Sequence, residues 1–131
     1  MSNLNKYLMT QIDAITWNAQ QPLIVVDADE VLLQFVTGLE TFIARHDLWL
    51  DLQSYRLLGN IKERESGDPI SPESLKVILR DFFASESLHL DPVPHAATSL
   101  QALARRAQII VLSNVPADQR HARAANLAGH G

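Results

Sequence analysis

Two short apolar runs along the chain predict the strands of a small parallel sheet. Residues 23–27 and 108–112 are almost continuously apolar, and polar side chains stand at the end of each run. Unbroken apolar residues, rather than alternating ones, are typical of strands buried on both faces, as in a parallel sheet. Helical patterns separate the two runs, so we expect a parallel pair joined by a right-handed crossover.

Helical periodicity accounts for most of the remaining chain, with apolar residues recurring every three or four positions. The segments with this pattern are residues 3–17, 32–45, 71–85, 96–106 and 116–128. Ser71 followed by Pro72 is a favourable helix start, because serine caps the first turn and proline fits it. The first helix, with Leu4, Leu8, Ile12 and Ile15 on one face, is expected to pack on the domain, a dimer contact being the alternative. Residues 47–52 are predicted to form a turn or a second helix, and residues 61–69 a polar loop.

The connection between the two strands is much longer than one helix requires. A minimal βαβ unit takes about 30 residues, whereas most of this chain lies between the two apolar runs. Residues 33–90 are therefore predicted to form a helical cap over the strand ends. Residues 1–32 and 91–131 form the partial α/β core in this interpretation.

Composition limits the classes of protein to consider. The chain has 131 residues, of which 47% are hydrophobic and 20% charged, as expected of one globular domain. Its net charge of −4 disfavours nucleic acid as a partner. No apolar run approaches the roughly 20 residues of a membrane span, no signal peptide is evident, and cysteine is absent, so no membrane partner and a cytoplasmic location are expected. Four arginines are predicted to lie on solvated helix faces. They are Arg105, Arg106, Arg120 and Arg123.

The residues that follow the two strands are the candidates for chemistry. Asp27 ends the first strand and Asp29 comes two residues later, while Ser113 and Asn114 end the second strand. Ligands bind at the carboxyl ends of strands in open α/β sheets. Two nearby carboxylates can differ in pKa and supply a nucleophile and a general acid, and carboxylate oxygens suit Mg²⁺. The Ser113 hydroxyl and the N–H groups of the turn after it are suited to holding phosphate oxygens.

Less specific explanations stay open for these residues. Asp27 and Asp29 could form a strand-end turn that caps the next helix, and Ser113 could be an ordinary strand-end serine. The pattern excludes an EF-hand, because Val31 and Leu32 occupy positions that need an acid or amide and a glycine. The chain also lacks a P-loop, a G-x-S-x-G elbow, a G-x-G-x-x-G loop and a H-E-x-x-H motif.

At these residues the chain resembles a known family. Asp27-Ala-Asp29-Glu-Val31 looks like the first motif of the haloacid dehalogenase (HAD)-like hydrolases, D-x-D-x-[TV], after its usual apolar strand. Val-Leu-Ser113-Asn114 is similar to their second motif, an apolar strand that ends in Ser or Thr. Residues 94–103 look like the proline turn and helix that lead into that strand. The resemblance covers most of residues 20–128.

The resemblance implies an α/β fold with a HAD-like Rossmannoid core, made of a partial parallel sheet with helices packed on it, and an α-helical cap insertion. It implies a Mg²⁺-dependent phosphatase that acts on a small phosphorylated metabolite through an aspartyl-phosphate. Asp27 would be the nucleophile and Asp29 the general acid and base. The Asp27 carboxylate and the Asp29 backbone carbonyl would bind Mg²⁺. Ser113, with Asn114 beside it, would bind the phosphoryl group.

The chain departs from the family pattern after its second motif. The family uses a third motif with a lysine and a fourth with acidic residues. After Ser113 this chain has one acidic residue, Asp118, and no lysine. All of its lysines come earlier, at Lys6, Lys62 and Lys76. Three explanations compete: a truncated remnant of a longer enzyme, a homodimer in which another copy completes the sheet edge, or a non-catalytic phosphate-binding or protein-interaction module. Phosphoryl transfer needs charge neutralisation by metal and cation together, so the loss of both groups is expected to cost orders of magnitude in rate.

Overall fold

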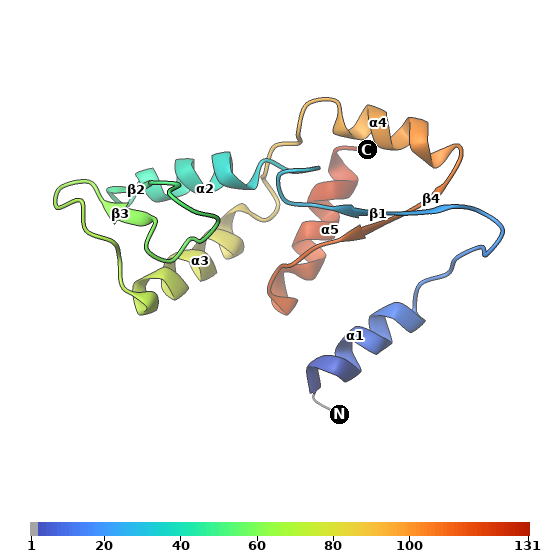
Figure 1. The fold of residues 1–131 in the computed structure, drawn as a ribbon, viewed down its shortest axis with the longest axis horizontal. Coiled ribbons are helices and arrows are strands. Elements are labelled where there is room, and N and C mark those ends of the chain that lie inside the picture. The colour runs from blue at the N-terminus through green and yellow to red at the C-terminus, as the bar shows by residue number, and fades with distance from the viewer. Residues whose placement is uncertain (1–2) are drawn as a thin grey trace.

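The computed structural model describes residues 3–131, which form a mixed α/β fold (Figure 1). Within these residues the strands form a parallel pair and a separate antiparallel hairpin. The elements in chain order are α1 (Asn3–Asp13), β1 (Leu23–Asp27), α2 (Phe35–Ala44), β2 (Leu48–Leu50), β3 (Ile61–Glu63), α3 (Pro72–Glu86), α4 (Ala96–Ala104), β4 (Gln108–Leu112), a 3-10 turn (Ala117–Gln119) and α5 (Arg120–Gly129). No helix in this part of the chain is long and apolar enough to cross a membrane.

The strands β1 and β4 pair in parallel, which confirms the interpretation of the two apolar runs. Leu23 lies opposite Gln108 and Asp27 opposite Leu112. The Gln108 side chain helps to fix this register, because its carboxamide accepts a hydrogen bond from the Asn18 N–H and donates one of 2.6 Å to the Asn18 carbonyl. The two strands therefore finish at the same edge, and the residues after them start there.

The expectation that both strands are buried on both faces is wrong, since Leu112 of β4 is 67% exposed. The same holds for β1. Its side chains alternate: Ile24 and Val26 are half-buried, whereas Val25 is 57% exposed. The reason is that the parallel sheet has two strands in residues 3–131, and the side that carries Val26 is the one that packs against the core. A continuous apolar run predicts where a strand forms. How deeply its side chains are buried depends on the layers that cover the sheet.

The hydrophobic core is centred on the segment between β1 and α4, which we call the insert. Phe82 of α3 is 1% exposed and meets Phe35 and Phe42 of α2 edge-on, with ring centroids 5.4 and 5.6 Å away. Leu33 and Leu90, at the two ends of the insert, belong to the same buried cluster and connect it to the parallel pair. Figure 1 shows the insert beyond the edge at which β1 and β4 finish.

The start of α3 follows the prediction made from its sequence. Ser71 has an extended backbone, and its hydroxyl accepts a hydrogen bond of 3.1 Å from the Ser74 N–H. Pro72 occupies the first position of the helix and Glu73 lies in its first turn, where a negative charge is favourable. The helix then runs to Glu86, one residue past the expected end.

The insert is not helical throughout, which corrects the expectation of an α-helical cap. The segment predicted as a turn or second helix contains β2, and the predicted polar loop begins with β3. The two strands pair antiparallel, with Leu48 opposite Glu63 and Leu50 opposite Ile61. Leu48 and Ile61 are buried against α2 and α3, which stabilises strands of three residues that are too short to show a period of their own.

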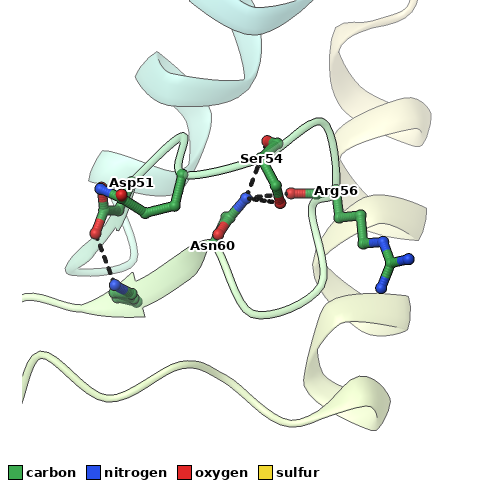
Figure 2. A network of polar contacts seen from close by, with 6 residues as sticks. Asp51, Ser54, Arg56 and Asn60 are labelled. Carbon is green, nitrogen blue, oxygen red and sulfur yellow. Dashed lines mark hydrogen bonds and ion pairs between the residues drawn. The ribbon is translucent and has the colours of Figure 1, made fainter.

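A polar network orders the loop between β2 and β3 (Figure 2). Buried Asn60 donates through Nδ2 to the carbonyl oxygens of Ser54 and Arg56, at 3.1 and 2.6 Å. Lys62 of β3 forms an ion pair of 2.6 Å with Asp51. These contacts give the buried Asn60 amide its hydrogen-bond acceptors. They also pair the charge of Lys62 with that of Asp51 inside the insert.

The ends of four helices differ from the prediction by two residues or more. α2 begins at Phe35 rather than at residue 32. α1 ends at Asp13 rather than at residue 17, α4 ends at Ala104 rather than 106, and the last predicted helix opens with the 3-10 turn. Ile12 is exposed, although it lines a cavity together with residues of β4 and α5. The side chains of Leu4 and Leu8, the other apolar positions of that helix, lie outside the described residues.

Candidate functional site

A tight turn carries the chain out of β1. The carbonyl oxygen of Ala28 accepts hydrogen bonds from the N–H groups of Leu32 and Leu33, at 2.8 and 2.9 Å. Glu30 adopts a positive φ of 61°, which the turn requires. Ala28 is completely buried, Asp27 is exposed, and Asp29 lies between them in burial. Because of this turn, the side chain of Asp27 lies in solvent, whereas that of Asp29 is partly buried.

Glu30, not Asp27 or Asp29, caps the next helix. The carboxylate of Glu30 accepts a hydrogen bond from the Val36 N–H in the first turn of α2. Gln34, at the N-cap position, makes no such bond with its side chain. A negative charge at this end also interacts favourably with the helix dipole. The capping explanation considered for the two aspartates therefore applies to the acid beside them.

Arg123 of α5 joins the ends of the two strands. Its Nη1 forms an ion pair of 2.8 Å with Oδ1 of Asp29 and donates a hydrogen bond of 2.9 Å to Oγ of Ser113. The arginine side chain is 2% exposed and that of Asp29 is 27% exposed. Nε and Nη2 of Arg123 have no hydrogen-bond partner within residues 3–131. A buried cation with two unpaired donors thus stands between the two motifs.

The prediction for Arg123 was wrong, since it placed this residue on a solvated helix face. Arg105, Arg106 and Arg120 are exposed as predicted, although Arg105 and Arg106 follow the end of α4 and only Arg120 lies in a helix. A signal was present in the sequence: Arg123 lies four residues before Leu127, the one large apolar residue of α5, and so shares its face. A helix with so few apolar residues gives a weak pattern, and an arginine at an inward position is easily assigned to the surface.

Two further contacts hold α5 in place. Buried Asn126 donates through Nδ2 to the carbonyl oxygen of Leu90, at 3.2 Å, and Nε2 of His130 lies 3.0 Å from the same oxygen. Leu90 is part of the hydrophobic core. These contacts therefore attach α5 to the end of the insert. They help to fix the position of the Arg123 guanidinium relative to the ends of β1 and β4.

The pKa of Asp29 is perturbed by its surroundings. Burial raises the pKa of this carboxyl above its usual value of 3.8, and the positive charge and hydrogen bonding of Arg123 oppose the rise without cancelling it. The nearby negative charges of Asp27 and Glu30 add to the rise. A carboxyl group in such a place holds a proton more readily than one in water.

The oxygen atoms at this edge suit a hard divalent cation only in part. Asp27 offers an exposed carboxylate, and the backbone carbonyl of Asp29 accepts no backbone hydrogen bond in the described chain. Among residues 3–131, no three His, Cys, Asp or Glu side chains gather as a metal cluster. Mg²⁺ often takes one or two carboxylates and completes its shell with water and substrate phosphate. The donors fit that kind of site, not an all-protein cage.

The other predicted residues are placed less specifically. Ser113 is half-buried and contacts Arg123, whereas Asn114 is exposed in the turn after β4. Lys76 of α3 lines a cavity of about 310 Å³ together with Pro116 and Asp118 from the segment after that turn. Arg123 thus connects Asp29 to Ser113, and Asp27 lies at the end of the neighbouring strand. Separately, Lys76 of the insert lies beside the segment that follows Ser113 and Asn114.

Comparison of the chain with family models finds no match. Comparisons with the curated proteins and with the solved structures find none either.

Proposed function

We propose that the chain is a HAD-like hydrolase that removes a phosphoryl group from a small phosphorylated metabolite with the help of Mg²⁺. One observation carries the proposal: the parallel register brings Asp27 and Ser113 to one edge, and Arg123 links Ser113 to Asp29 there. A nucleophile, an acid and a phosphate-binding hydroxyl are the groups that such a reaction needs. The resemblance of the two motifs to that family supplies the assignment of roles.

Each side chain has a defined part in the proposed reaction. An oxygen of the Asp27 carboxylate attacks phosphorus, the bond from phosphorus to the leaving oxygen breaks, and Asp29 gives that oxygen a proton. Water then attacks the aspartyl-phosphate, with Asp29 taking a proton from it, and inorganic phosphate leaves. The raised pKa of Asp29 supports the acid step, because a carboxyl that keeps its proton to higher pH is a better donor at neutral pH. Exposed Asp27 is free to act as the nucleophile.

The proposal includes one magnesium ion, held by the Asp27 carboxylate and the Asp29 backbone carbonyl. Bound there, Mg²⁺ supplies positive charge against the phosphoryl oxygens. Ser113 contributes a hydroxyl to the same oxygens.

A second candidate is a non-catalytic module that binds a phosphorylated ligand. The observation that favours it is the use of the charged groups: Lys62 is paired with Asp51 inside the insert, and Arg123 is paired with Asp29. A site whose lysine is paired elsewhere lacks one positive charge that phosphoryl transfer uses, although it can still hold an anion. The two candidates differ in whether Asp27 has to be a nucleophile.

Hydrolysis of an aryl phosphate separates the two candidates. The purified chain is assayed with Mg²⁺ and with EDTA, beside Asp27→Asn and the control Asp118→Asn, an exposed acid with no assigned role. The phosphatase proposal predicts turnover that needs Mg²⁺, disappears in Asp27→Asn and persists in Asp118→Asn. Phosphate binding without turnover by any of the three proteins contradicts the phosphatase and supports the binding module.

A further inference from the structure

The buried guanidinium of Arg123 is the charged group that the candidate site leaves without a role. It contacts Asp29 and Ser113 through Nη1 alone, while Nε and Nη2 are unpaired within the described residues. Leaving buried N–H donors without partners is costly. A planar guanidinium is suited to oxyanions, because its donors match two oxygens at once. Its place beside Ser113 thus points to an oxyanion as the missing partner.

The hydrogen bond between Arg123 and Ser113 has a direct consequence for that partner. Oγ of Ser113 accepts from Arg123, so the hydroxyl proton of the serine is free to be donated elsewhere. The serine can then present an O–H to the same anion that the arginine attracts. The two side chains therefore form a pair of donors at the end of β4.

A cavity lies beside these donors. Ser113 and Arg123 line a cavity of about 420 Å³ between β4, α5 and α1. Arg120, one turn earlier on α5, lines the same cavity but is exposed. The two arginines thus share a location and a charge and differ in burial and in contact with Ser113.

We propose that Arg123 is the phosphoryl-binding cation of this site and acts together with Ser113, which it orients through its hydrogen bond. The inference rests on the proposed function, since it assigns the positive charge of that same site. A fixed, buried cation interacts with an anion more strongly than an exposed one, because less water screens it. Asp29 keeps the guanidinium in place through Nη1, which leaves Nε and Nη2 without a partner among the described residues.

Binding of inorganic phosphate in the presence of Mg²⁺, measured by isothermal titration calorimetry, tests the proposal. Arg123→Gln removes the charge but keeps a hydrogen-bonding group, Arg123→Lys keeps the charge but loses the fork, and Arg120→Gln is the matched control. Losing a charge-assisted hydrogen bond is expected to weaken binding by at least about tenfold in Arg123→Gln. Arg123→Lys should fall between this variant and the wild type, and Arg120→Gln should bind within about twofold of the wild type.

The outcomes separate this inference from the proposed function. A wild-type chain that binds no phosphate with Mg²⁺ overturns both. A wild-type chain that binds phosphate, with Arg123→Gln binding equally well, overturns the role of Arg123 and leaves the proposed function standing. Melting temperatures are measured alongside, and if Arg123→Gln does not fold, Arg123→Lys decides. Affinity that follows the order Arg, Lys, Gln supports a charge role, whereas affinity that follows the melting temperature instead contradicts it.

Discussion

The ion pair between Arg123 and Asp29 allows a quantitative prediction about stability. Two substitutions remove its partners one at a time: Arg123→Met keeps most of the side-chain volume without the charge, and Asp29→Asn keeps an oxygen acceptor without the charge. The two residues approach to 2.8 Å, and the arginine is almost fully buried. We therefore expect the losses of the single variants to be coupled in the double variant.

The size of the effect follows from the burial of each partner. Removing one partner of a fully buried ion pair costs about 3–5 kcal/mol, because the other charge is left unpaired. Asp29 is 27% exposed, so water can partly replace Arg123, and the lost bond to Ser113 adds about 1 kcal/mol. We expect Arg123→Met to cost about 3 kcal/mol and the coupling energy to be about 1–2 kcal/mol. Asp29→Asn should cost less than Arg123→Met, because the raised pKa of Asp29 means that burial disfavours its charged form.

Urea unfolding of four proteins measures this coupling. The wild type, the two single variants and the double variant are unfolded at pH 7 and constant ionic strength, and the four free energies of unfolding form a double-mutant cycle. Repeating the cycle at about 1 M NaCl tests burial, because a surface pair is screened at that concentration and a buried one much less. Most of the coupling should therefore survive the added salt.

Additive losses would contradict an interaction between Arg123 and Asp29. If the two single losses sum to the loss of the double variant within about 0.5 kcal/mol, the residues do not interact energetically. The contact would then contribute to the shape of the site without stabilising it. Coupling that disappears at high salt would show that the pair is exposed, against the burial observed for Arg123.

Three further predictions concern the rest of the chain. In Gly38→Ala, the new Cβ would lie 2.5 Å from Leu90 Cδ2 in the core. The free energy of unfolding in urea should therefore fall by about 1–2 kcal/mol relative to the wild type. A rise of about 1 kcal/mol, as alanine gives in an unhindered helix, would contradict this prediction. Asp51 has a pKa below 3.8 because Lys62, and then Gln53, hydrogen-bond to its carboxylate. Asp51→Asn should thus lower the free energy of unfolding above pH 3.8, a difference that fades as pH falls through the lowered pKa; a constant difference would contradict this. One edge of β1 has no strand partner within residues 3–131, and such an edge favours pairing with a second copy of the chain. Analytical sedimentation should therefore show dimers of the wild type, and Val25→Lys, on the exposed face of β1, should weaken them. A wild type that is monomeric at all concentrations would contradict this prediction.

The parallel pair could be predicted because its signals are local. β1 and β4 begin and end at the predicted residues, since each is a short apolar run bounded by polar side chains. The capped start of α3 is equally local, because Ser71, Pro72 and Ser74 are neighbours in sequence. The exposure of Val25 could not be predicted in this way, because it depends on which layers cover the sheet.

The missed features of the site depend on contacts between distant residues. Asp29 and Arg123 are far apart in sequence, and nothing near Arg123 distinguishes it from the exposed Arg120 except its phase with Leu127. The candidate residues Asp27, Asp29 and Ser113 could be found, because strand ends collect ligands in α/β sheets. The contacts of Arg123 with Asp29 and Ser113 become evident only in the fold, because the phase of Arg123 with Leu127 is a weak signal.

Direct detection of a phosphorylated Asp27 tests the central proposal most closely. The chain is incubated with Mg²⁺ and an aryl phosphate, quenched in acid, digested and analysed by mass spectrometry, beside Asp27→Asn. The account predicts one added phosphoryl group on the wild-type peptide that contains Asp27, and none on the same peptide of the variant. Release of phosphate with no phosphorylated peptide, or a phosphoryl group that persists in Asp27→Asn, would contradict the assignment of Asp27 as the nucleophile.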